Sequence, residues 1–153
     1  MPFDELTTLF IYDLRLCDSK FEAAFPDAIL LGLAELPGRR IGFTKSGLGS
    51  FLAPQGTLKG LLWCLSSSEL GLFEREMCLP TNAVRTEISI ITRRGFESLA
   101  EAHFSPDPDE IEAPIGPLLQ LLACARAWRF DWSYLNELTA LVSPAQPLRF
   151  GEA

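Results

Sequence analysis

The chain reads Leu58-Lys59-Gly60-Leu61-Leu62-Trp63-Cys64-Leu65 and then Ser66-Ser67-Ser68-Glu69, and this junction decides the fold. Residues 58–65 are almost continuously apolar, which is typical of a buried strand. Ser66 and Glu69 have the spacing of a capping box, in which the serine hydroxyl and the glutamate carboxylate each accept a backbone N–H at a helix start. We therefore predict a buried strand followed directly by a short helix that ends at about Glu76.

Further strands are predicted on both sides of this junction from runs of β-branched, aromatic and aliphatic residues. They cover residues 7–12, 28–36, 39–44, 83–92 and 96–104. The second and third are expected to pair with each other across the turn Pro37-Gly38, and the last two across a hairpin turn at residues 93–95. The glycine-rich residues 45–50 are expected to form a mobile loop.

Helices are predicted mainly after the strands. Residues 115–130 carry apolar side chains at helical spacing, and Asp131 can cap a last helix that runs to about Leu141. A further short helix is expected at residues 20–25. Strands first and helices late predict an α+β fold, a small barrel-like mixed β-sheet with packed helices.

Length and composition describe an ordinary globular protein. The 153 residues are expected to form one domain over residues 1–153, with its core at about residues 7–142. Apolar residues make up 48% and charged residues 22% of the chain, which excludes disordered, collagen-like and coiled-coil classes. No disulfide or metal is needed at this size, because one core can bury enough surface.

Net charge and the number and spacing of cysteines make some classes of binding partner less favourable. A net charge of −7 and a pI near 4.7 disfavour nucleic acid and anionic membranes. The four cysteines form no Cys-x-x-Cys pair and His103 is the single histidine, so we expect no metal site. The first residues lack the features of a signal peptide, and no apolar run reaches the ~20 residues of a membrane span. We therefore expect a cytoplasmic protein with free thiols.

A series of short motifs carries a resemblance to a known family. The series comprises Tyr12 at a strand end, Arg40-Ile41-Gly42-Phe43, Leu52-Ala53-Pro54, Gly60-Leu61-Leu62-Trp63-Cys64-Leu65-Ser66, Leu72-Phe73-Glu74-Arg75-Glu76 and Arg85 in a strand. In order and spacing it resembles the γ-glutamylcyclotransferase-like family, which includes the AIG2-like proteins. The resemblance covers about residues 7–104 and is weaker through the later helices. It implies the fold of that family.

The resemblance also implies functional positions. Glu76 matches the glutamate that serves as general acid/base in the family, and Tyr12 and Leu16 match the first and last residues of its substrate-binding loop. Within that loop, Asp13, Leu14 and Arg15 replace the family's glycine, serine and asparagine. We assign substrate binding to residues 12–15, with the Arg15 guanidinium compensating for Asp13 at a substrate carboxylate.

Three more departures lie in the helix motif and before the strand arginine. Phe73 and Met77 replace the aspartate and the glycine of the family's helix motif, and Ala83 replaces a tyrosine. The departures fall on the side of the site that binds substrate, so they bear on the identity of the substrate.

The implied activity is cyclisation of a γ-glutamyl amine or amide, which releases 5-oxoproline and a free amine. Such an enzyme is a transferase or lyase that needs no cofactor, acts on a small molecule, and works as a monomer or homodimer. Two alternatives remain open. One is a repurposed enzyme of a specialised biosynthetic pathway with another substrate and reaction, and the other is a non-catalytic binding module of the same fold.

Local sequence alone supports plainer interpretations of the same residues. Glu76 can be the solvated end of a short helix, and Asp13 and Arg15 can be exposed turn residues. Glu74 lies on a different side of the helix from Glu76 and is expected to be solvated. His103 is expected to be a surface or capping residue, because no second ligand accompanies it.

Overall fold

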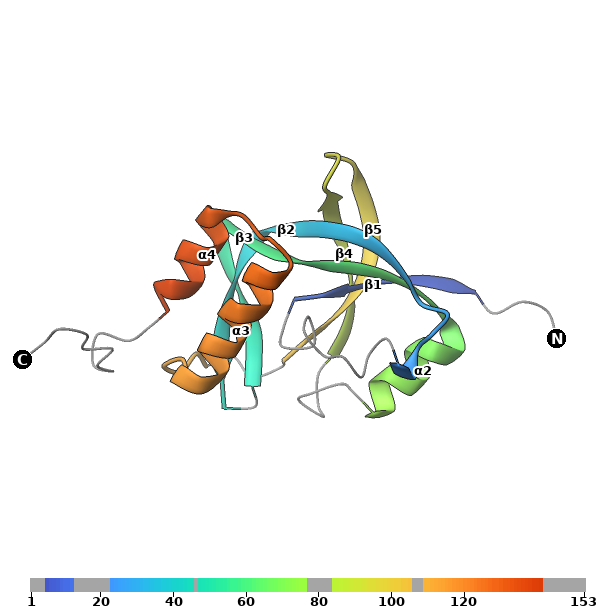
Figure 1. Cartoon of the computed structure of the whole chain (residues 1–153), viewed down its shortest axis with the longest axis horizontal. Coiled ribbons are helices and arrows are strands. Elements are labelled where there is room, and N and C mark those ends of the chain that lie inside the picture. Colours follow the sequence, from blue (N-terminus) through green and yellow to red (C-terminus); the bar gives the residue numbers. More distant parts are fainter. Residues whose placement is uncertain (1–4, 13–22, 46, 77–83, 106–108, 142–153) are drawn as a thin grey trace, which may run out of the picture.

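Five strands close into a small barrel in the computed structural model of the chain (Figure 1). The structure describes residues 5–12, 23–45, 47–76, 84–105 and 109–141. The elements are β1 (Leu6–Ile11), β2 (Ile29–Thr44), β3 (Gly47–Ser66), α2 (Ser67–Glu76), β4 (Val84–Thr92), β5 (Glu97–Phe104), α3 (Ile115–Ala127) and α4 (Trp132–Thr139). The expected α+β fold with a barrel-like sheet is confirmed.

Strands β2 and β3 form one long antiparallel ribbon, paired from Ile29 opposite Cys64 to Thr44 opposite Gly47. The expected pairing of residues 28–36 with residues 39–44 is wrong, because both belong to β2. Gly38 has a φ of 84° and the register shifts between Pro37 and Arg39, so the Pro-Gly pair makes a bulge instead of a reversal.

The glycine-rich segment after residue 45 is also different from the expectation. Apart from Lys45 in the turn, its described backbone belongs to β3, so the expected mobile loop is wrong. Gly42 of β2 pairs with Gly49 of β3, and a Cβ atom on Gly42 would lie 2.6 Å from the Phe51 ring. The glycines here allow close packing between paired strands.

The barrel closes through β1. This strand is antiparallel to β3, with Ile11 opposite Leu61, and parallel to β5, with Leu9 opposite Glu101. Strands β4 and β5 form the expected hairpin around residues 93–95, and β4 joins β2 at Ala34 and Thr92. The sheet order is therefore β1-β3-β2-β4-β5.

The helices begin where the sequence indicates. Ser66 and Glu69 form the expected capping box, with N···O distances of 2.9 and 3.1 Å. The Asp131 side chain accepts the backbone N–H of Tyr134 at 2.9 Å and so caps α4. Helix α3 ends at Ala127, before the expected residue 130, because Arg129 adopts a φ of 60°. Helices α3 and α4 lie at the end of the barrel opposite α2 (Figure 1).

Two remaining expectations concern the first helix and the cysteines. The helix expected at residues 20–25 lies partly outside the described residues. Within the described part, Ala23 and Ala24 are helical and Phe25 is not. Cys64 is a free thiol, whereas the buried Cys124 is disulfide-bonded. The expectation that all thiols are free is therefore wrong. Within the described ranges, no helix has the length and apolar character needed to cross a lipid bilayer.

Candidate active site

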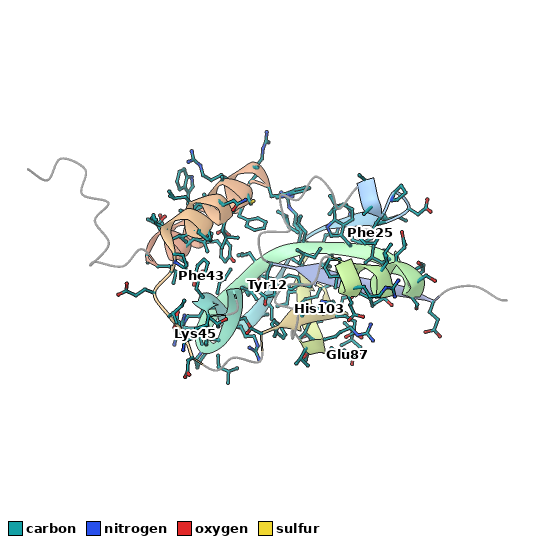
Figure 2. All side chains as sticks on the ribbon, turned by 90° about the horizontal axis from the view of Figure 1, so that it is seen from below. Tyr12, Phe25, Phe43, Lys45, Glu87 and His103 are labelled. Carbon is teal, nitrogen blue, oxygen red and sulfur yellow. The ribbon has the colours of Figure 1, made fainter. Side chains whose placement is uncertain are left out.

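Tyr12 lies directly after β1 and is almost fully buried, with 1% of its surface exposed. Its hydroxyl donates a hydrogen bond to the backbone oxygen of His103 at 2.9 Å. Its ring lies between Phe10 and Phe104, with centroid distances of 6.2 and 5.7 Å. Figure 2 shows Tyr12 and His103 next to each other beside α2. These contacts fix the end of β1 against β5.

His103 lies on β5 and is buried, with 4% of its surface exposed. Its Nε2 atom is 2.8 Å from a carboxylate oxygen of Glu74, and its ring packs against Phe73 at 5.6 Å. The expectation of a surface or capping histidine is therefore wrong. The β4–β5 register places His103 opposite Arg85, and its ring contacts Phe73 and Glu74 of α2.

Glu74 differs from its expectation as well. Its side chain is 31% exposed and pairs with His103, and the same oxygen lies 3.6 Å from Nε of Arg85 on β4. Arg85 is the cross-strand neighbour of His103. One carboxylate of α2 therefore contacts the side chains of two paired strands. A carboxylate beside an imidazole can orient the ring and stabilise its protonated form.

The predicted catalytic residue is at the end of the same helix. Glu76 is the last residue of α2, two residues after Glu74, but its side chain lies outside the described part of the structure. The same holds for Asp13, Leu14 and Arg15 of the predicted binding loop. The structure brings together the residues next to them, since Tyr12 precedes the loop and α2 ends at Glu76.

Sequence reasoning missed the cluster of Glu74, Arg85 and His103. A usable signal was present, because the predicted hairpin turn at residues 93–95 already places Arg85 opposite His103. A lone histidine and an arginine at one cross-strand position can share a carboxylate from another element. The sequence does not predict that α2 approaches Arg85 and His103.

The described residues contain no group of three or more His, Cys, Asp or Glu side chains placed to hold a metal ion. The site therefore consists of a tyrosine, an imidazole–carboxylate pair and an arginine. Such groups can position a polar substrate and carry protons.

No protein-family profile and no curated protein matches the sequence. A solved structure described as a γ-glutamyl cyclotransferase superposes with a TM-score of 0.78 over 94% of this chain and 92% of that one. The chain has the γ-glutamyl cyclotransferase fold. The sequence identity is 16%.

Two further structures share the γ-glutamyl cyclotransferase fold. A human protein described as uncharacterized is 18% identical and has a TM-score of 0.75, covering 92% of this chain and 90% of its own. An AIG2-like protein from mouse is 14% identical, with a TM-score of 0.50 over 73% of this chain and 93% of that one. At these identities the similarity establishes the γ-glutamyl cyclotransferase fold and leaves the reaction to chemical argument.

Proposed function

We propose that this protein cyclises a γ-glutamyl amine or amide and releases 5-oxoproline and a free amine, with Glu76 as general acid/base. One observation carries the proposal. Tyr12 and Glu74 both contact His103, at 2.9 and 2.8 Å, so the start of the predicted binding loop and the last turn of α2 meet at one place. The likeness to a structure described as a γ-glutamyl cyclotransferase over most of both chains supports it.

In this reaction the protein itself forms no covalent bond, because the nucleophile and the carbonyl group both belong to the substrate. The α-amine of the substrate attacks its own γ-carbonyl carbon, a five-membered lactam forms, and the bond to the leaving amine breaks. Holding the glutamyl chain folded can supply an effective molarity of about 10⁵ to 10⁸ M, or about 7 to 11 kcal/mol. The remaining task is proton transfer.

Glu76 is the group proposed for that transfer. An α-ammonium with a pKa of about 8 must lose a proton, and a glutamate with an ordinary pKa of about 4.3 would accept it at a cost of about 5 kcal/mol. In this proposal the Glu76 carboxylate is partly shielded from water, which lowers this cost because desolvation disfavours the carboxylate. The protonated Glu76 then donates its proton to the leaving amine.

The loop after Tyr12 is proposed to bind the substrate. In this proposal the Arg15 guanidinium pairs with the α-carboxylate of the glutamyl group and offsets the charge of Asp13, while Leu14 lines the site. The fixed ring and hydroxyl of Tyr12 support this role, because they anchor the residue from which the loop departs. We further propose that the enzyme works in the cytoplasm, as a monomer or homodimer and without a cofactor.

A second candidate is a repurposed enzyme of the same fold with a different substrate and reaction. It is favoured by the Glu74–His103 pair, since a buried imidazole held by a carboxylate can transfer protons itself. In that case His103 would replace Glu76 as acid/base, and the altered residues 13–15 would accept a substrate without the glutamyl carboxylate.

The test is incubation of the protein with a panel of γ-glutamyl amines and γ-glutamyl dipeptides, with 5-oxoproline as the measured product. Release that Glu76→Gln abolishes supports the first proposal. Release that survives Glu76→Gln and disappears in His103→Gln supports acid/base catalysis by His103. A folded protein that releases no 5-oxoproline from any panel member contradicts the proposed reaction and favours a different reaction or a binding module.

A further inference from the structure

A cleft of mixed character runs between strand β2, the β4–β5 turn and the α3–α4 connection. One part is a cavity of about 600 Å³ and the other a cavity of about 390 Å³, and the two share Leu33, Thr92 and Arg93 in their walls. The combined size suits a small-molecule ligand. Neither part is lined by Tyr12, Glu74 or His103.

The cleft is remote from the candidate active site. Arg85 and His103 lie near the open end of the β4–β5 hairpin, whereas the cleft includes residues 92–94 at its turn. Arg93, in the turn after β4, lies eight positions along the chain from Arg85, which is about 26 Å at about 3.3 Å per residue of extended strand. In Figure 1 the hairpin turn lies at the top of the view, and α2 lies at the lower right.

The larger cavity is mainly apolar. Its walls include Leu30 and Leu31 of β2, which are 39% and 54% exposed, and Trp128 at the end of α3. Leu31 has no register partner, because the pairing shifts between Leu30 and Gly32, and Gly32 adopts a φ of 127°. This bulge depends on a conformation that glycine adopts readily and keeps two leucines in the open cavity.

The smaller cavity and the rim are basic. Lys59 is neutralised by Glu35 at 2.6 Å and Asp131 at 3.2 Å. Arg93 and Arg129, which also line this cavity, have no carboxylate within ion-pair distance in the described part of the chain, and neither has Arg94 on the rim of the larger one. Three unneutralised guanidinium groups beside exposed leucines contrast with the net charge of −7 of the chain.

We propose that this cleft binds a small amphipathic anion, a carboxylate or phosphate carried on an apolar body. The apolar body would lie against Leu30, Leu31 and Trp128, and the anionic group would reach Arg93 and Arg94 at the rim. Guanidinium groups bind carboxylate and phosphate through charge-assisted hydrogen bonds. This site is independent of the reaction proposed above.

The test uses decanoate as the probe, with binding measured by displacement of the fluorescent dye 8-anilinonaphthalene-1-sulfonate. Wild-type protein is expected to bind decanoate at least tenfold more tightly than decanol, because only the carboxylate can pair with the arginines. The double variant Arg93→Gln/Arg94→Gln is expected to weaken decanoate binding at least tenfold and to leave decanol binding within twofold.

Two further variants test whether the effect is specific to the cleft and whether the protein remains folded. Arg126→Gln removes one positive charge from α3, half of what the double variant removes, without altering the lining of the cleft, and it should change decanoate binding less than twofold. Leu31→Ser, at a half-exposed position, should weaken the binding of both decanoate and decanol. The far-ultraviolet circular dichroism spectrum of this variant should be unchanged. Equal affinities for decanoate and decanol, or an unaffected double variant, would overturn the proposal. So would an absence of binding at millimolar decanoate.

Discussion

The Nε2 atom of His103 lies 2.8 Å from a carboxylate oxygen of Glu74, and this contact joins α2 to β5 across 29 positions of sequence. The backbone oxygen of the same histidine accepts the hydroxyl of Tyr12. His103 therefore ties the end of β1 and the last turn of α2 to one strand of the barrel. Glu76, the proposed acid/base, follows Glu74 by two residues at the end of α2.

Glu74→Gln should lower the free energy of unfolding by about 1 kcal/mol, since a hydrogen bond between His103 and a carboxylate is replaced by one to a neutral amide at a partly exposed position. Urea denaturation measures the change. Glu87→Gln on exposed β4 is the matched control and should shift stability by less than about 0.5 kcal/mol. Equal effects of the two substitutions would show that the His103 contact contributes no net stability.

Tyr12→Phe should lower stability by about 1 kcal/mol, because a buried hydrogen bond to the His103 carbonyl is lost. Tyr134→Phe is the control. Its hydroxyl is buried near the backbone of Lys59 without forming a well-made hydrogen bond, and burial raises the pKa of this phenol. Its removal should leave stability unchanged or raise it. A larger loss in Tyr134→Phe than in Tyr12→Phe would contradict this assignment of contacts.

Gly60→Ala should destabilise the barrel by at least about 2 kcal/mol, through overpacking in a filled interior. The added Cβ atom would lie 2.4 Å from the backbone oxygen of Ile11 and 2.8 Å from the Phe10 ring. Gly71→Ala in α2 meets nothing closer than 3.7 Å and should stabilise by up to about 1 kcal/mol, because alanine favours the helix. Thermal unfolding compares the two. A neutral Gly60→Ala would mean that β1 is less tightly packed on β3.

The structure bears out those parts of the fold that depend on neighbouring residues. The capping box at Ser66 and Glu69 and the cap at Asp131 each need only three or four residues, and both are present. The β4–β5 hairpin was predictable for the same reason. The Pro37-Gly38 pair led to a wrong prediction, because the same residue types occur in turns and in bulges. The two differ in which strand the flanking residues pair with, and local sequence does not show this.

Contacts between distant elements could not be predicted in the same way. The parallel pairing of β1 with β5 and the approach of Glu74 to His103 depend on barrel closure, which no local pattern encodes. The resemblance to a family supplied Tyr12 and Glu76 as candidate residues, whereas physical reasoning from local sequence favoured a solvated helix end. The predicted functions of Glu76 and of residues 13–15 remain proposals.

Acid pH should remove a stabilising contribution of Asp131. The backbone N–H of Tyr134 lowers the pKa of this carboxyl, and Lys59 lowers it further against a partial opposing effect of burial. A lowered pKa in the folded state means that the contribution is present above the unfolded pKa of about 3.9 and is lost as pH falls through the folded value.

Asp131→Asn keeps an acceptor at the cap but removes this titration. Urea denaturation of both proteins should show wild type more stable near neutral pH by no more than about 0.5 kcal/mol, because solvent screens this exposed carboxylate, with the difference shrinking below pH of about 4. A difference that is constant from neutral pH to pH of about 2 would show that the charge of Asp131 has no part in it.

The most direct test of the proposed mechanism compares two glutamates of one helix. With a γ-glutamyl substrate from the panel, the rate of 5-oxoproline release is measured for wild type, Glu76→Gln and Glu74→Gln. Loss of a general acid/base predicts a decrease of about 10²- to 10⁴-fold for Glu76→Gln, and loss of a positioning contact predicts a smaller decrease for Glu74→Gln. A Glu76→Gln variant that releases 5-oxoproline at the wild-type rate would contradict the account.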